Sequence, residues 1–91
     1  MIHLGPYTFD DVVYDARGDV LYMSIGKPRP AADSPPSPEG HIIRFDENDE
    51  LIGVTIVNAK WLLERDGELL VTFPERSAVA DTRELEAALA A

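Results

Sequence analysis

The chain has 91 residues, 45% of them hydrophobic and 27% charged, which is the composition of one folded domain rather than of a disordered segment. Its 17 acidic and 8 basic residues give a formal net charge of −9, so the basic patch that binds nucleic acid is missing and anionic membrane surfaces are disfavoured. Cysteine is absent, which excludes disulfides and thiolate metal sites.

Two further expectations concern location and assembly. No stretch approaches the roughly 18 apolar residues of a membrane span, and the first residues lack the charged start and long apolar run of a signal peptide, so we expect a cytoplasmic protein. A chain this short buries only about 60–65% of the surface that its unfolded form exposes, which leaves a thin margin of stability. Because disulfides are excluded, we expect self-association as a homodimer.

The first predicted hairpin runs from about residue 8 to residue 25. Strand-forming residues at 12–14 precede a turn at 15–19, in which Gly18 is free to take a positive φ. The alternation that follows places Leu21, Met23 and Ile25 on one face. This pattern predicts a half-buried strand at residues 20–25.

A proline-rich segment, residues 26–40, separates this hairpin from the next and holds five of the seven prolines. Proline cannot donate to a sheet, so the segment is predicted to be a loop with polyproline II character. About fifteen residues is long for a loop within a compact domain. The loop is either functional or mobile, or else a surface insertion that the fold tolerates.

The second predicted hairpin covers residues 41–58. Its two strands flank a charged turn at residues 46–50, and Ile52, Val54 and Ile56 share one face of the second strand. This is the strongest strand pattern in the chain.

The rest of the chain predicts a helix, a strand and a second helix. A short helical period at 59–65 ends at Asp66 and Gly67, and residues 68–73 have the pattern of a strand. Asp81 is placed to cap the final helix, and Glu84 three residues later completes a sequence typical of a capping box.

Catalytic and metal-binding motifs are weak throughout. His3 and His41 are the only histidines, and neither forms a local signature with a serine nucleophile. Asp46, Asn48 and Glu50 imitate the start of a calcium loop, but Leu51 takes the position of the essential glycine, which favours a solvated turn. The glycines are spread as turn residues and form no phosphate loop, and we expect no cofactor.

Two spaced motifs carry a resemblance to a known family. Residues 14–22 have the form Tyr-Asp, three residues, Asp, one residue, Leu-Tyr, and residues 45–59 add Phe-Asp, the charged turn and Leu-Ile-Gly-Val-Thr-Ile-Val-Asn-Ala. Over about residues 12–60 the chain therefore resembles the small bacterial domain-of-unknown-function family 2283. The resemblance implies an antiparallel sheet module without established catalytic residues. Because some members are thought to be encoded beside small basic toxins of the ribonuclease type, it also implies an antitoxin-like role.

The motif residues also have a structural interpretation. Asp15 and Asp19 are expected to accept hydrogen bonds from backbone amides within the turn, and Tyr22 is expected to pair across the strands with Tyr14. Gly53 inside a strand indicates a bulge or a close approach of the backbone.

The elements together predict a single α+β domain over residues 1–91. We expect a twisted antiparallel sheet of four or five strands built from consecutive hairpins, with a short helix after the second hairpin and a C-terminal helix packed on one face. Its parts are a family-like hairpin core (12–60), the proline-rich loop (26–40) and a C-terminal strand and helix (61–91). The predicted core consists of Leu21, Met23, Ile25, Ile43, Phe45, Ile52, Val54, Ile56, Leu69, Val71 and Leu85.

The leading functional hypothesis is a non-enzymatic module that binds a basic protein through its acidic surface. Trp61, the only tryptophan, either faces a partner or joins the core, and a dimer forms either edge to edge or through Trp61. The alternative is a small-ligand or metal-binding domain with a site at a homodimer interface, for which His41 and Asp46 are the residues to test. The candidate partner-binding residues are Asp46, Glu47, Asp49, Glu50 and Trp61.

Overall fold

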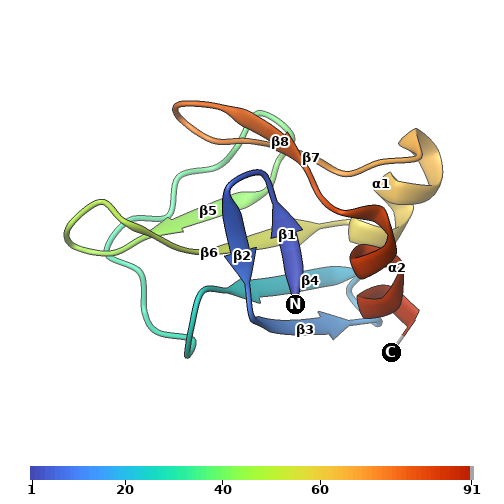
Figure 1. The fold of residues 1–91 in the computed structure, drawn as a ribbon, viewed down its shortest axis with the longest axis horizontal. Helices are drawn as coiled ribbons and strands as arrows, with labels where there is room; N and C mark the ends of the chain where they lie inside the picture. Colours follow the sequence, from blue (N-terminus) through green and yellow to red (C-terminus); the bar gives the residue numbers. More distant parts are fainter. Residues whose placement is uncertain (91) are drawn as a thin grey trace.

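A computed structural model describes residues 1–90 and has an α+β fold with antiparallel sheets (Figure 1). The elements in chain order are β1 (Ile2–Leu4), β2 (Tyr7–Phe9), β3 (Asp11–Asp15), β4 (Val20–Ser24), β5 (Ile42–Phe45), β6 (Leu51–Val57), α1 (Ala59–Asp66), β7 (Leu70–Thr72), β8 (Ser77–Val79) and α2 (Thr82–Ala90).

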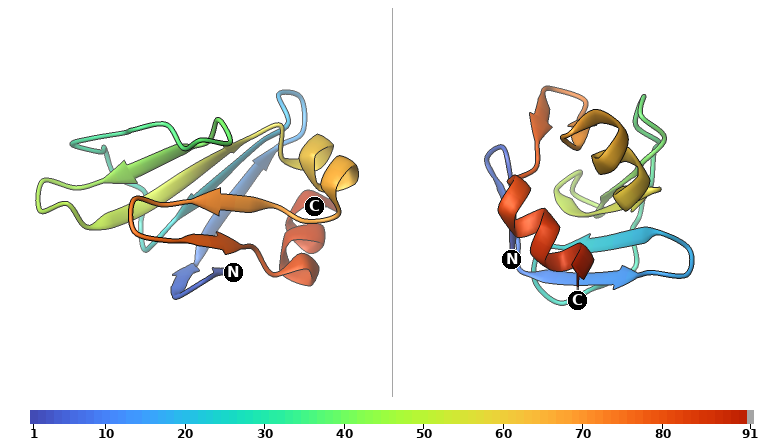
Figure 2. Two further views of the ribbon diagram at one scale, coloured as in Figure 1. Left: turned by 90° about the horizontal axis from the view of Figure 1, so that it is seen from above. Right: turned by 90° about the vertical axis from the view of Figure 1, so that its right-hand side faces the viewer.

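The main sheet has four strands in the order β3-β4-β6-β5, all antiparallel. Its two halves are the two predicted hairpins, which join through the pairing of β4 with β6. The prediction of consecutive hairpins forming one antiparallel sheet is therefore confirmed. Figure 2 shows β1–β2, β7–β8 and α2 on the same side of this sheet.

Two short hairpins complete the fold, and neither is predicted in full from the sequence. No strand is predicted before residue 8, whereas β1 and β2 form a hairpin around a turn in which Gly5 has φ 60°. A single strand is predicted at residues 68–73, whereas β7 pairs with β8 across a second turn. A bridge between Leu4 and Ala80 then links the first hairpin to the end of the last one.

The core lies between the main sheet and these hairpins. Most of the predicted core residues are buried, but Ile25 is 37% exposed because it lies beyond the last residue of β4, and Phe45 is only half-buried. The hairpins and helices contribute further buried side chains that the sequence analysis does not name. These are Ile2, Leu4, Phe9, Ala59, Phe73, Ala80 and Leu89.

The proline-rich segment follows the outer edge of β5 instead of projecting into solvent. The Phe45 amide donates to the Asp33 carbonyl, and the Ile43 amide donates to the Pro35 carbonyl, both at 2.9 Å. The Ala32 amide donates back to the Phe45 carbonyl at 2.9 Å. The prolines between such residues have no amide donor, so the segment satisfies β5 without presenting a complete new edge. It therefore protects this side of the sheet from pairing with another chain.

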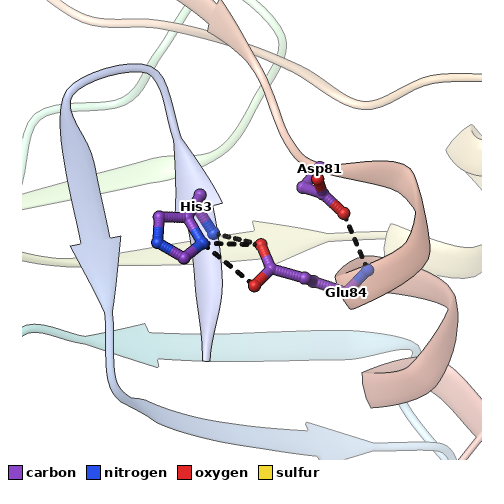
Figure 3. Close-up of polar contacts among 3 residues, drawn as sticks. All are labelled: His3, Asp81 and Glu84. Atoms are coloured by element: carbon purple, nitrogen blue, oxygen red, sulfur yellow. Dashed lines mark hydrogen bonds and ion pairs between the residues drawn. The ribbon is translucent and has the colours of Figure 1, made fainter.

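Helix α2 begins as predicted at Asp81 and is tied to β1 (Figure 3). The Asp81 carboxylate accepts a hydrogen bond from the Glu84 amide at 3.0 Å, which confirms the cap. The Glu84 side chain does not return to the Asp81 amide as a capping box requires, because it accepts from the amide and Nδ1 of His3 at 2.8 and 2.9 Å. The Asp81 amide donates instead to the His3 carbonyl. The helix start and the first strand are thus fixed to one another.

Candidate functional site

A groove of about 500 Å³ lies where the β5–β6 turn, the proline-rich segment and the β7–β8 turn meet. These turns lie toward the left of Figure 1, away from both helices. The groove is lined by Tyr7, Asp33, Pro35, Phe45, Asp49, Glu50, Leu51, Phe73, Pro74 and Glu75.

Aromatic and aliphatic side chains form the apolar part of this groove. The rings of Tyr7 and Phe73 are 4.9 Å apart between centroids and inclined at 57°, a tilted aromatic contact. Phe73 follows β7 and is 4% exposed, whereas Tyr7 and Phe45 are half-buried. The register of β5 against β6 shifts between Arg44 and Phe45, and this bulge alters the position of Phe45 at the end of the strand.

Four exposed carboxylates and no basic side chain complete the lining of the groove within the described residues. They are Asp33, Asp49, Glu50 and Glu75, and they come from three separate segments of the chain. Aromatic faces and carboxylates both attract cations, and apolar walls accommodate an alkyl stem. The lining therefore fits a cationic group on an apolar stem, as in a lysine or arginine side chain.

Asp46 positions two of these carboxylates and is not itself open to a partner. It is 4% exposed, and its Oδ1 accepts from the amides of Asn48 and Glu50 at 2.8 and 3.0 Å. Its Oδ2 accepts from Arg29 at 3.1 Å. The bond from the Glu50 amide, with those from Asn48 and Arg29, holds the pKa of Asp46 below its ordinary value. Asp46 thus shapes the turn that carries Asp49 and Glu50.

The remaining predicted partner-binding residues lie outside the groove. Glu47 is exposed on the same turn but is not part of the lining. Trp61 is 55% exposed on α1, with the guanidinium carbon of Arg65 at 4.7 Å from its ring centroid. The structure therefore brings Asp49 and Glu50 together in one site and leaves Trp61 elsewhere.

Sequence reasoning missed Tyr7, Phe73 and Glu75 because it did not predict the hairpins that carry them. The available signals were turn residues, Gly5-Pro6 before Tyr7 and Pro74 after Phe73. Neither signal indicates that the two turns lie beside the β5–β6 turn. That proximity depends on tertiary packing.

Among the motif residues, Asp19 caps helix α1 rather than the turn in which it lies. Its carboxylate accepts from the amides of Lys60 and Trp61 at 2.8 and 3.1 Å and from the Tyr14 hydroxyl at 2.8 Å. Asn58, the residue before the helix, makes no side-chain cap bond, so Asp19 supplies the missing acceptor from a distant segment. Burial opposes ionisation, but these three hydrogen bonds lower the pKa of Asp19 overall.

The other motif residues confirm some expectations and correct others. Asp15 accepts from the Arg17 amide at 3.1 Å within the turn, as predicted, whereas the same prediction for Asp19 is wrong. Tyr22 lies opposite Val13, and Tyr14 lies opposite Leu21, so the two tyrosines point to opposite faces and do not pair.

Gly53 confirms both parts of its prediction. A Cβ at this position would lie 2.8 Å from the Met23 carbonyl oxygen, which is a close approach of the backbone. The bulge in the β5–β6 pairing also begins beside it, where Arg44 pairs with Gly53 and Phe45 pairs with Leu51. A glycine at this position therefore lets β4, β6 and β5 pack closely together.

The two histidines have separate structural surroundings. His3 is exposed and bound to Glu84 (Figure 3). His41 is 1% exposed, and its Nδ1 accepts from the Val57 amide at 3.2 Å. Burial lowers the pKa of His41, although Glu39 opposes this effect. His41 is therefore a neutral, hydrogen-bonded residue of the interior.

Metal-ligand clusters and membrane-spanning helices are both absent from the described residues. Residues 1–90 contain no group of three or more histidine, aspartate or glutamate side chains placed to hold a metal ion. No helix in the same part of the chain is long and apolar enough to cross a membrane.

Comparison with known proteins identifies one family. The model described as "Protein of unknown function (DUF2283)" matches residues 11–60, which is more than half of the chain, and it confirms the resemblance seen in the sequence. No curated protein and no solved structure matches the chain. The matched region contains the Tyr14–Asp19 cap and the β5–β6 side of the groove, whereas Tyr7, Phe73 and Glu75 lie outside it.

Proposed function

The chain belongs to the DUF2283 family, whose function is unknown, and from that premise we propose that it is a non-enzymatic binding module whose groove takes a basic segment of a protein partner. The observation that carries the proposal is the composition of the groove, in which three aromatic rings and four carboxylates occur with no basic side chain. The net charge of −9 supports it further, because a basic partner is attracted from a distance.

The expected energetics follow from the exposure of the carboxylates. Each exposed ion pair contributes about 0–1 kcal/mol, and a cation over an aromatic face adds roughly 0.5–2 kcal/mol. Several such contacts in one groove support moderate affinity that weakens as salt rises. The apolar stem of the bound side chain would contact Phe45 and Leu51 and retain part of that affinity at high salt.

A calorimetric titration with a lysine-rich peptide tests this proposal. Replacing Asp49, Glu50 and Glu75 together by Asn, Gln and Gln is expected to weaken binding by about tenfold, because three of the carboxylates are lost from the groove. The matched control replaces Glu47, Glu68 and Glu86 by Gln, which removes the same charge from exposed positions outside the groove.

The control separates local binding from general attraction. The control variant is expected to keep most of the affinity, and a peptide with glutamate in place of lysine is expected not to bind. Equal losses in the two triple variants would show that only net charge matters and would contradict a site in the groove.

A finer form of the proposal is an antitoxin-like role, in which the partner is a small basic toxin. It rests on the role that the sequence resemblance implies and on the same acidic groove, whereas the description of the family names no function. The wild type and the control variant are expected to recover one small basic protein in stoichiometric amount from the host lysate. The groove variant is expected not to recover it. Recovery of the same protein by both variants would contradict binding through the groove.

The aromatic lining also favours a second candidate function, the binding of a small ligand. Tyr7 and Phe73 form the kind of apolar surface that binds organic cations. A thermal-shift panel of aliphatic and quaternary amines distinguishes this candidate, since a small ligand would stabilise the wild type without any protein partner. A metal-binding site, including one at a homodimer interface, is tested by adding divalent metals to the same panel.

A further inference from the structure

The four-stranded sheet has an outer face that no helix or hairpin of the described chain covers. The core cluster lies on the other side of the sheet, where Figure 2 shows β1–β2, β7–β8 and α2. On the outer face, Val13 is 57% exposed and Tyr22 is 46% exposed. Exposed apolar side chains that adjoin one another across strands are typical of an interaction surface.

Strand register arranges this face in rows. Val13, Tyr22, Thr55 and Ile42 lie opposite one another across β3, β4, β6 and β5, and they form an apolar middle row. The neighbouring row runs from Asp11 on β3 through Ser24 and Gly53 to Arg44 on β5. The middle of this row is closed, because Ser24 and Gly53 are buried, and Arg44 Nη2 donates to the Arg29 carbonyl of the proline-rich segment at 2.6 Å. The face thus has an acidic end at β3 and a basic end at β5.

Pairing with a second copy is blocked at the β5 edge and is unfavourable at the β3 edge in the register centred on Val13. The proline-rich segment covers β5, since the Phe45 amide is already bound to the Asp33 carbonyl. Antiparallel pairing of β3 with its own copy, centred on Val13, would place Asp11 opposite Asp15, and like charges in that position are destabilising. These features favour the outer face over the edges as the surface for assembly.

We propose that a second copy of this chain packs its outer face against this one, about a two-fold axis parallel to the strands and between β4 and β6. Such an axis exchanges the β3 side with the β5 side, so each row meets the same row of the other copy. Val13 of one copy then faces Ile42 of the other, and Tyr22 faces Thr55. Asp11 of each copy faces Arg44 of the other copy, so the acidic end of one face meets the basic end of the other.

Sedimentation velocity of the full chain over a wide concentration range tests the dimer. Val13→Glu and Tyr22→Glu each introduce a charge at an exposed position, so the fold is expected to persist while the dissociation constant rises by about tenfold or more. Val79→Glu is the matched control, because Val79 is 44% exposed on β8 and outside this face. Circular dichroism verifies that each variant is folded.

A charge exchange tests the two-fold arrangement itself. Asp11→Arg is expected to weaken the dimer by opposing two arginines, and Asp11→Arg combined with Arg44→Glu is expected to restore it. A folded double variant that stays monomeric would overturn the arrangement. A wild-type chain that is monomeric at every concentration, or a dimer that Val13→Glu and Tyr22→Glu leave intact, would overturn the dimer face.

Failure of this proposal is distinguishable from failure of the proposed function. The groove variant with Asp49, Glu50 and Glu75 replaced alters none of the residues in the two rows, so it is expected to remain dimeric. The face variants are likewise expected to bind the lysine-rich peptide as the wild type does.

Discussion

At the scale of single residues, the close approach of the backbone at Gly53 favours glycine at this position. A Cβ there would lie 2.8 Å from the Met23 carbonyl oxygen, which is backbone in a central strand and has little freedom to move. Gly53→Ala is therefore expected to lower the free energy of unfolding by about 1–3 kcal/mol in urea denaturation.

Gly18→Ala is the matched control for this prediction. A Cβ at Gly18 would lie 3.3 Å from the Asp15 carboxylate, a side chain that can shift. We expect a smaller loss of stability than at Gly53. Equal losses in the two variants would indicate that general loss of backbone freedom, and not the contact with Met23, determines the effect.

The buried imidazole of His41 makes stability depend on pH. Because the pKa of His41 is lower in the folded chain than its ordinary value of 6.5, the unfolded state binds the proton more readily. The contribution of neutral His41 to the free energy of unfolding is therefore complete above pH 6.5 and is lost as the pH falls below that value. The carboxylates of Asp19, Glu39 and Asp46 have lowered pKa values and stay ionised in this window.

Urea denaturation at about pH 7.5 and about pH 5.5 measures this dependence. The wild type is expected to be less stable at the lower pH, and His41→Gln is expected to lose most of that difference. His3→Gln, which alters the exposed histidine, serves as the control and is expected to keep it. A difference that is unchanged in His41→Gln would contradict the role given to burial.

At the scale of elements, helix α1 depends on a cap from another segment. Asp19→Ala removes the acceptor for the Lys60 and Trp61 amides and is expected to cost about 1 kcal/mol of stability. Hydrogen exchange at these two amides is expected to accelerate. Asp15→Ala is the control, since its carboxylate accepts only within the β3–β4 turn and its loss should leave α1 protected.

The elements also show how far the sequence predicts the fold. The two central hairpins are predicted because Leu21 and Met23, like Val54 and Ile56, alternate cleanly on strands of five and seven residues. Strands β1, β2 and β8 have only three residues each, too few for alternation to be distinguished from chance. The role of Asp19 could not be read locally, because its partners lie 41 and 42 residues away.

At the scale of the whole molecule, the groove and the outer face occupy different parts of the surface. The groove joins the β5–β6 turn to two hairpins that lie outside the region matched by the family. The sequence analysis predicts the charged turn with Asp49 and Glu50 but not the aromatic floor, since Tyr7 and Phe73 are brought together only by packing. The groove therefore combines residues inside the family region with Tyr7, Phe73 and Glu75 outside it.

The most direct test of the central claim is an NMR titration of isotope-labelled protein with the lysine-rich peptide. If the groove is the binding site, the amide shifts of Phe45, Leu51 and Phe73 change with one saturating affinity, and those of α1 around Trp61 do not. Changes centred on Trp61, or no saturable change at the groove, would contradict the account.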